Sequence, residues 1–134
     1  MMTTNNTKRT AICLALTSTL TVAATEALAQ NNTNYGINAL VNNTTGIDNS
    51  AFGASALASN TICLFNTARG SLSLSLNTTG IANTASGYAS LRSNTTGTAN
   101  TASGDRSLYS NTAANLNTAS GFESLYSKDR KSVG

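Results

Sequence analysis

A unit of 17 residues repeats along most of this chain without drift. Five full copies begin at Asn43, Asn60, Asn77, Asn94 and Asn111, and a partial copy in the same register spans 32–42. Three positions never vary, and in the full copies they are the seventh (Asn49, Asn66, Asn83, Asn100, Asn117), the eleventh (Gly53, Gly70, Gly87, Gly104, Gly121) and the fifteenth (Leu57, Leu74, Leu91, Leu108, Leu125). A short fixed period is typical of coils that stack on their neighbours. Because a repeated coil has no single active site, function is expected to lie on a surface.

Turn and strand signals alternate within the unit. The first four positions, Asn-Thr-Thr-Gly in 77–80, and the Gly at position eleven are typical of turns. Positions seven to ten and thirteen to sixteen are predicted to be extended. The pattern therefore predicts an all-β fold, a parallel β-solenoid or β-roll of 17-residue coils with strands about 4.8 Å apart. A helical solenoid is excluded, because known helical repeats need about 33 residues or more and because Gly, Asn and Thr disfavour helix.

A single coil of this composition cannot be stable by itself. Ordering the backbone costs about 1–2 kcal/mol per residue, whereas one buried Leu returns about 1.5–3 kcal/mol. Further stability is expected from Asn stacked on Asn at the seventh position, as in cross-β side-chain ladders. It is also expected from packing against other copies of the chain, so the sequence predicts an oligomer.

The chain divides into four segments. Residues 1–29 are predicted to be a signal peptide, with basic Lys8 and Arg9, an apolar stretch and a small-x-small cleavage site at 27–29. That stretch is shorter than the ~20 residues that span a bilayer, so no transmembrane anchor is predicted in this chain. Residues 30–42 form an N-terminal segment with the partial repeat, 43–127 hold the five full repeats, and 128–134 form a short basic tail. Export to the cell surface, the outer membrane or the extracellular space follows from the signal peptide.

The charge pattern gives no sign of a nucleic-acid partner. Within the full repeats, three basic residues balance three acidic ones: Arg69, Arg92 and Arg106 against Asp48, Asp105 and Glu123. No basic stripe with interleaved aromatic residues is present. The chain has no His, and its carboxylates are scattered, so neither a tuned general base nor a metal cluster is expected. We therefore predict a protein that is not an enzyme and has no catalytic residues, no cofactor and no metal.

Cys63 occupies the fourth position of its copy, where most other copies carry Gly. The other cysteine, Cys13, lies in the predicted signal peptide, so a disulfide within the mature chain is excluded. Cys63 is interpreted as a drifted small residue, with a nucleophile or an intermolecular bridge as the alternatives.

Positions twelve, thirteen and sixteen vary widely in size and polarity, which indicates exposure. A packed site would not accept Ile37, Ser71, Tyr88 and Asp105 in turn at one position. Six residues at these positions are the candidate exposed ligand contacts: Tyr88, Arg92, Arg106, Tyr109, Phe122 and Tyr126. The alternative for all of them is a plain solvated turn.

The unit NTTGxxNTASGxxSLxS resembles the head repeats of trimeric autotransporter adhesins of Gram-negative bacteria, the YadA-like group. The resemblance covers residues 32–127 and is carried by Asn83-Thr84-Ala85 before Gly87 and by the small-Leu pair Ser90-Leu91 after it. It implies a left-handed parallel β-roll with one repeat per coil and three chains packed side by side as a homotrimer. It also implies binding to a host extracellular matrix protein, a cell-surface protein, other cells or abiotic surfaces.

Two features depart from the family pattern. The family carries an aliphatic residue that points into the roll just before the Gly, whereas three copies here carry Ser86, Ser103 and Ser120. These serines are expected to weaken the core. The coiled-coil stalk and β-barrel anchor of the family are also not recognisable, which leaves either a truncated reading frame or a protein secreted without an anchor.

The leading hypothesis is a surface-exposed or secreted adhesin head fragment. A functional amyloid subunit is an alternative, because Asn-rich parallel stacking suits it. An ice- or crystal-binding β-solenoid is another, based on the row of Thr at the second position (Thr44, Thr61, Thr78, Thr95, Thr112). A non-functional truncated adhesin fragment is the third.

Overall fold

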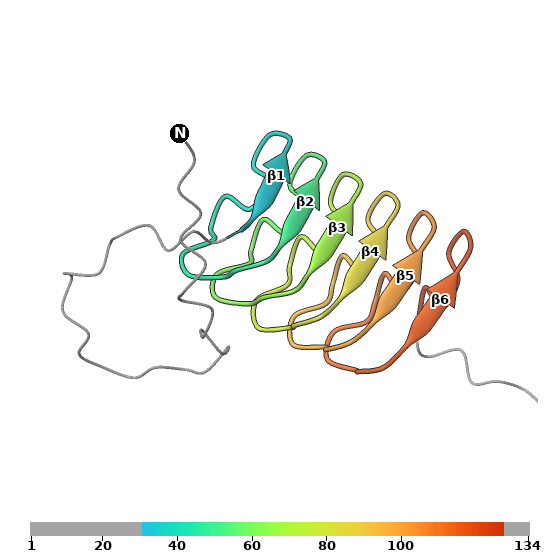
Figure 1. The fold of residues 1–134 in the computed structure, drawn as a ribbon. Coiled ribbons are helices and arrows are strands. Elements are labelled where there is room, and N and C mark those ends of the chain that lie inside the picture. Colours follow the sequence, from blue (N-terminus) through green and yellow to red (C-terminus); the bar gives the residue numbers. More distant parts are fainter. Residues whose placement is uncertain (1–30, 128–134) are drawn as a thin grey trace, which may run out of the picture.

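The computed structural model describes residues 31–127, so the predicted signal peptide and the predicted basic tail at 128–134 lie outside the described residues. Within them the chain winds into stacked coils, each with one short strand on the same side (Figure 1). The strands are β1 (Thr33–Tyr35), β2 (Ser50–Phe52), β3 (Thr67–Arg69), β4 (Thr84–Ser86), β5 (Thr101–Ser103) and β6 (Thr118–Ser120). They form one parallel sheet in sequence order. Partners are one repeat apart, as in Thr84 opposite Thr101, which confirms the all-β solenoid of 17-residue coils.

Each coil has only one strand, and the second extended segment predicted at positions thirteen to sixteen is wrong. There the chain forms turns in which the thirteenth and fifteenth residues adopt positive φ, as in Ala89 (52°) and Leu91 (49°). Bonds between coils persist through this turn, because Leu91 N donates to Ser107 O at 3.0 Å. A local turn bond from Asn94 N to Leu91 O at 3.1 Å follows. The positive φ of the invariant Leu thus directs its side chain into the coil, while the hydrogen bonds between coils continue.

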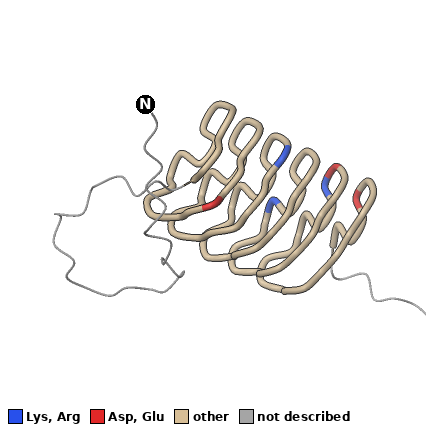
Figure 2. Tube along the Cα trace, in the orientation of Figure 1, with Lys and Arg blue, Asp and Glu red and all other residues tan. Residues whose placement is uncertain are grey.

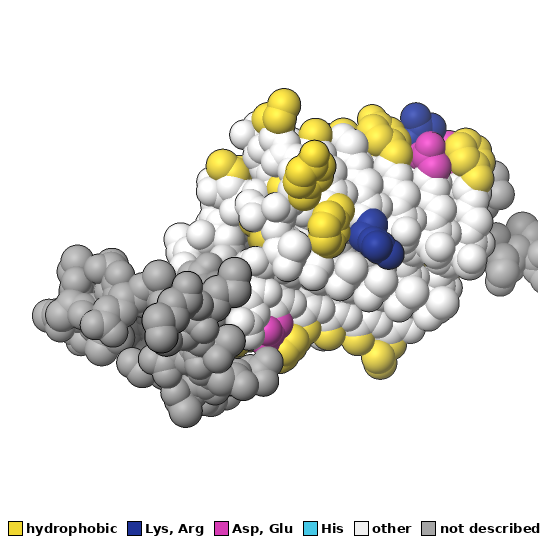
Figure 3. Space-filling model, turned by 45° about the horizontal axis from the view of Figure 1, so that its top comes forward, with side chains coloured by type: hydrophobic (Ala, Val, Ile, Leu, Met, Phe, Trp, Pro, Cys, Tyr) yellow, Lys and Arg dark blue, Asp and Glu magenta, His cyan; other side chains and the backbone are white. Residues whose placement is uncertain are grey.

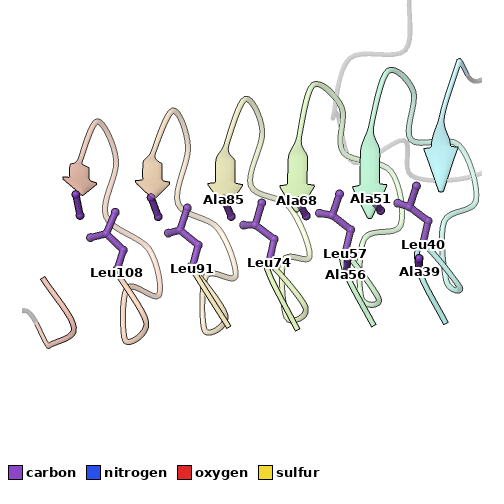
Figure 4. Packing of buried hydrophobic residues seen from close by; sticks show 12 residues of the cluster. Ala39, Leu40, Ala51, Ala56, Leu57, Ala68, Leu74, Ala85, Leu91 and Leu108 are labelled. Atoms are coloured by element: carbon purple, nitrogen blue, oxygen red, sulfur yellow. The ribbon is translucent and has the colours of Figure 1, made fainter. Parts of the chain in front are cut away.

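The core is a thin column of Leu facing a column of Ala (Figure 4). The fifteenth residues Leu57, Leu74, Leu91 and Leu108 are fully buried, and so are the ninth residues Ala51, Ala68, Ala85 and Ala102. Leu125 is 52% exposed, because among the described residues it is covered from one side only. Each coil is therefore stabilised by the coils on either side of it.

The tenth position faces outward, which corrects the expectation that Ser there weakens the core. Side chains alternate along a strand, so when the central Ala102 of β5 points inward, Thr101 and Ser103 point outward. Tyr35 and Phe52 hold the same position as Ser103 and are 79% and 40% exposed. Ser86, Ser103 and Ser120 therefore lie on the outer face of the sheet and do not weaken the core.

Two columns of buried Asn side chains join the coils. At the seventh position, the backbone N–H and Nδ2 of Asn100 donate to Asn83 Oδ1 at 3.0 and 3.1 Å. At the first position, Asn94 Nδ2 donates to Asn77 Oδ1 at 2.9 Å. The two columns meet at the fourth residue, where Gly97 O accepts from Asn83 Nδ2 at 2.8 Å and from Asn94 Nδ2 at 2.9 Å. The Asn stacking predicted at the seventh position is present, and the first position adds a column that the sequence analysis did not predict.

Candidate functional site: a groove lined by arginine and tyrosine

The loop that follows each strand carries the variable positions. The invariant Gly turns the chain out of the strand, and the loop then runs from position twelve to seventeen before the next Asn. Because the coils stack without drift, residues at one position of successive coils lie above one another. Position sixteen therefore forms a column in the last three coils, which consists of Arg92, Tyr109 and Tyr126.

This column is a continuous stack of flat groups. The rings of Tyr109 and Tyr126 are parallel, with an interplanar angle of 6° and centroids 4.9 Å apart, which matches the spacing of adjacent coils. On the other side of Tyr109, the guanidinium carbon of Arg92 lies 5.7 Å from the ring centroid. Arg92 Nη1 also donates a hydrogen bond to Tyr109 Oη at 2.8 Å. Ring stacking and cation–π attraction each contribute about 0.5–1.5 kcal/mol, so both contacts favour this arrangement of the column.

An open groove of about 480 Å³ runs beside the column. Its lining consists of Leu72, Tyr88, Ala89, Arg92, Arg106, Tyr109 and Tyr126. The volume lies within the range of about 300–1,000 Å³ typical of small-molecule sites. Tyr88, at 46% exposure, keeps nearly half of its side chain accessible, while Ala89 is buried. The groove thus combines ring surfaces and hydrogen-bond donors with a small apolar floor.

The two arginines of the groove differ in their charge partners. Arg106 Nη1 donates to Glu123 Oε1 at 3.0 Å, and Arg106 Nε lies 3.8 Å from Asp105 Oδ1. The hydrogen bond to Glu123, supported by the charge of Asp105, raises the pKa of Arg106 above its ordinary value. Opposite charges lie together on the loops of the last two coils (Figure 2). The ion pairs found in residues 31–127 both involve Arg106, so Arg92 has no carboxylate partner there.

Five of the six residues predicted as exposed ligand contacts line this one groove. Phe122 is the exception, since it is 69% exposed in the last described coil and does not line the groove. Sequence reasoning missed Leu72 and Ala89, which supply the apolar floor. Both occupy the thirteenth position, like Arg106, so their shared position was the signal that could have identified them.

Beyond the groove, the described residues hold a buried cysteine and no cluster of side chains that could ligate a metal. Cys63 is fully buried, and its Sγ donates to Thr78 O at 3.1 Å, as a small residue inside the coil would. No group of three His, Cys, Asp or Glu gathers between residues 31 and 127. The same part of the chain has no helix of the length and apolarity of a membrane span. On the face in Figure 3, hydrophobic side chains lie in several separate groups among polar side chains and backbone.

The groove offers donors and ring faces, which suits the binding of a ligand. It holds no nucleophile next to a base, because its polar groups are guanidinium and phenol. Comparison of the chain with protein-family models, with curated proteins and with solved structures finds no match.

Proposed function

We propose that this chain is the repeat head of a surface-exposed or secreted adhesin that attaches, without catalysis, to host matrix, cells or surfaces. The observation that carries the proposal is the groove, which gathers Tyr88, Arg92, Arg106, Tyr109 and Tyr126 on neighbouring coils. Aromatic residues and arginine are enriched where proteins recognise partners. The proposal includes a left-handed sense of winding and a homotrimer, both of which follow from the family resemblance.

A stacked solenoid supports attachment in two ways. Every coil is tied to the next by backbone bonds and by the Asn columns, so the groove is presented on a rigid support. In a trimer, three copies of the groove would act together. Linked weak sites raise the overall affinity by about 10²–10⁴ without any new contact, provided that they engage at the same time. Weak contacts in an open groove can then give firm attachment.

The row of Thr at the second position gives little support to ice or crystal binding. The hydroxyls of Thr78 and Thr95 donate to the carbonyl oxygens of Thr95 and Thr112 at 3.1 and 3.0 Å. Their hydroxyl hydrogens are therefore directed to the neighbouring coil and not to an outside lattice. A functional amyloid remains an outcome that the solution mass of the chain distinguishes.

Attachment is the direct test of the proposal. The purified chain is applied to surfaces coated with extracellular-matrix proteins and to cultured cells, and the retained protein is measured. We expect retention well above that of an unrelated protein. Arg92→Gln combined with Tyr88→Ala should reduce it by about tenfold or more, because it removes a charge-assisted donor and a ring of the groove.

Arg69→Gln is the matched control for this test. It removes the same charge from the outer side of β3, where Arg69 lies 6.0 Å from the ring of Phe52 and outside the groove. This variant should attach as the unchanged chain does. If the chain attaches to none of the surfaces, the adhesin proposal is overturned. An equal loss of attachment in both variants would show that the groove does not make the attachment.

A further inference from the structure

We infer that the groove binds the carboxylate of an acidic sugar residue, with Arg92 as the cation that anchors it. This inference deepens the proposed function and rests on it. Neither the repeat pattern nor the adhesin resemblance specifies the chemistry of a ligand. The specific features are the state of the two arginines and the arrangement of the tyrosines around them.

Arg92 is the arginine of the groove whose charge is not balanced by a carboxylate of the described residues. Its Nη1 donates to a neutral acceptor, Tyr109 Oη, at 2.8 Å, and its buried Nε has no acceptor among the described residues. The rest of the guanidinium therefore still offers N–H groups and a positive charge to a ligand. A carboxylate is the planar anion that a guanidinium binds in charge-assisted, often paired, hydrogen bonds.

The second arginine limits the ligand to a single anionic group. Arg106 is already bonded to Glu123 at 3.0 Å and lies close to Asp105, so its charge is balanced inside the protein. A dense polyanion such as nucleic acid would meet these two carboxylates beside the groove. One carboxylate on an otherwise neutral molecule fits this distribution of charge.

The remaining walls suit a sugar ring. Tyr88 is 46% exposed and presents its ring at the groove, where the negative ring face attracts the C–H groups of a pyranose. Tyr109 Oη accepts from Arg92, which leaves its own O–H to donate to a sugar hydroxyl. A volume of about 480 Å³ holds one or two sugar residues and leaves a longer glycan free to extend along the open groove.

The test uses two glycosides that differ at one group. Methyl β-glucuronide carries a carboxylate where methyl β-glucoside carries a hydroxymethyl group, and methyl sialoside presents a carboxylate from a second class of sugar acid. Binding to the full chain is titrated by saturation-transfer NMR. At least one acidic glycoside should bind with a Kd of about 1 mM, and the neutral glucoside should bind at least about tenfold more weakly. Which acid binds decides between uronic and sialic acids as the source of the carboxylate.

Variants connect the binding to Arg92. Arg92→Gln should lower the affinity for the acidic glycoside to that for the glucoside, Arg92→Lys should retain part of it, and Arg69→Gln should change nothing. Equal binding of glucuronide and glucoside, no binding of either acid, or full binding by Arg92→Gln would overturn the inference. If Arg92→Gln does not fold, the comparison of ligands on the unchanged chain still decides.

The two proposals fail in different ways. A chain that attaches to cells or matrix but binds neither acid keeps its adhesin function and loses this ligand. A chain that binds the glucuronide or the sialoside but attaches to no surface keeps the site and loses the adhesin function.

Discussion

Gly87→Ala is expected to lower the free energy of unfolding by more than about 3 kcal/mol. Gly87 has a φ of 130°, and an added Cβ would lie 2.5 Å from the carbonyl carbon of Gly104 and 2.9 Å from Asp105 N. The backbone strain alone costs about 1–3 kcal/mol. Relief of the clash requires the two coils to separate, because the atoms that the Cβ meets belong to the backbone. Separation would break the bonds from Thr84 N to Asn100 O at 2.8 Å and from Gly104 N to Ser86 O at 2.7 Å. The loss should exceed about 3 kcal/mol and is measured by urea denaturation followed by circular dichroism.

Gly121→Ala tests the cost of backbone strain without the steric clash of the added Cβ. Gly121 occupies the same position of the unit with a φ of 113°, but an added Cβ there would meet nothing within 4 Å. This variant should retain its β signal, with a loss of at most about 1–3 kcal/mol from strain. If Gly87→Ala is no more destabilising than Gly121→Ala, the close stacking of the coils at this Gly is wrong.

Asn83→Ala is expected to lower the free energy of unfolding by at least about 3 kcal/mol. Asn83 is fully buried and its Oδ1 accepts from both the backbone N–H and Nδ2 of Asn100, at 3.0 and 3.1 Å. Its own Nδ2 donates to Gly97 O at 2.8 Å and to Asn66 Oδ1 at 3.2 Å. Each lost bond contributes about 0.5–1.5 kcal/mol, and the buried N–H of Asn100 left without an acceptor costs about 1–3 kcal/mol more. Thermal and urea unfolding both measure the change.

Thr84→Ala is the control for the Asn column. Thr84 follows Asn83 directly, but its side chain points outward from β4 and is exposed. Its replacement should change the stability by no more than about 0.5 kcal/mol. Similar losses in the two variants would show that the buried Asn column does not join the coils in the way described.

The period of the sequence predicts the coil but not the path of the chain within it. Position and register of the strands follow from the invariant Asn and Gly, since these residues recur at the same place in every copy. The turn around the fifteenth residue could not be predicted in this way. Leu91 and its equivalents adopt φ near 50°, a region that residues with a Cβ rarely enter, so local preference points away from it. The bond from Leu91 N to Ser107 O and the burial of the Leu side chain hold this conformation.

The prediction that the tenth residue points into the core was wrong for a related reason. Side chains point alternately to the two faces of a strand, so in a three-residue strand either the central residue or the two flanking residues face the core. The family pattern favoured a flanking residue. In β4 the central Ala85 is fully buried, so the small Ala, together with Leu91, fills the narrow interior. A three-residue strand is too short for its sequence alone to distinguish the two arrangements.

The candidate site was predictable in its residue types and less so in its shape. Variation at positions twelve, thirteen and sixteen pointed to the residues of the groove, and stacking without drift brought Arg92, Tyr109 and Tyr126 into one column. The exposure predicted at these positions is only partly correct, because Ala89 at position thirteen and Ser75 at position sixteen are buried. The balance of charge between Arg106 and Glu123 also follows from their shared position in adjacent coils. The groove itself required the loop geometry, since its small apolar residues Leu72 and Ala89 carry neither a ring nor a charge that would mark them in the sequence.

The solution mass of the chain tests the central claim, that these repeats form a discrete trimeric solenoid head. It is measured by light scattering after size-exclusion chromatography, with circular dichroism on the same peak. We predict one peak with the mass of three chains and a β signal. A monomer would contradict this claim, and a monomer without a β signal would also indicate a non-functional fragment. Large β-rich assemblies would contradict it in favour of a functional amyloid.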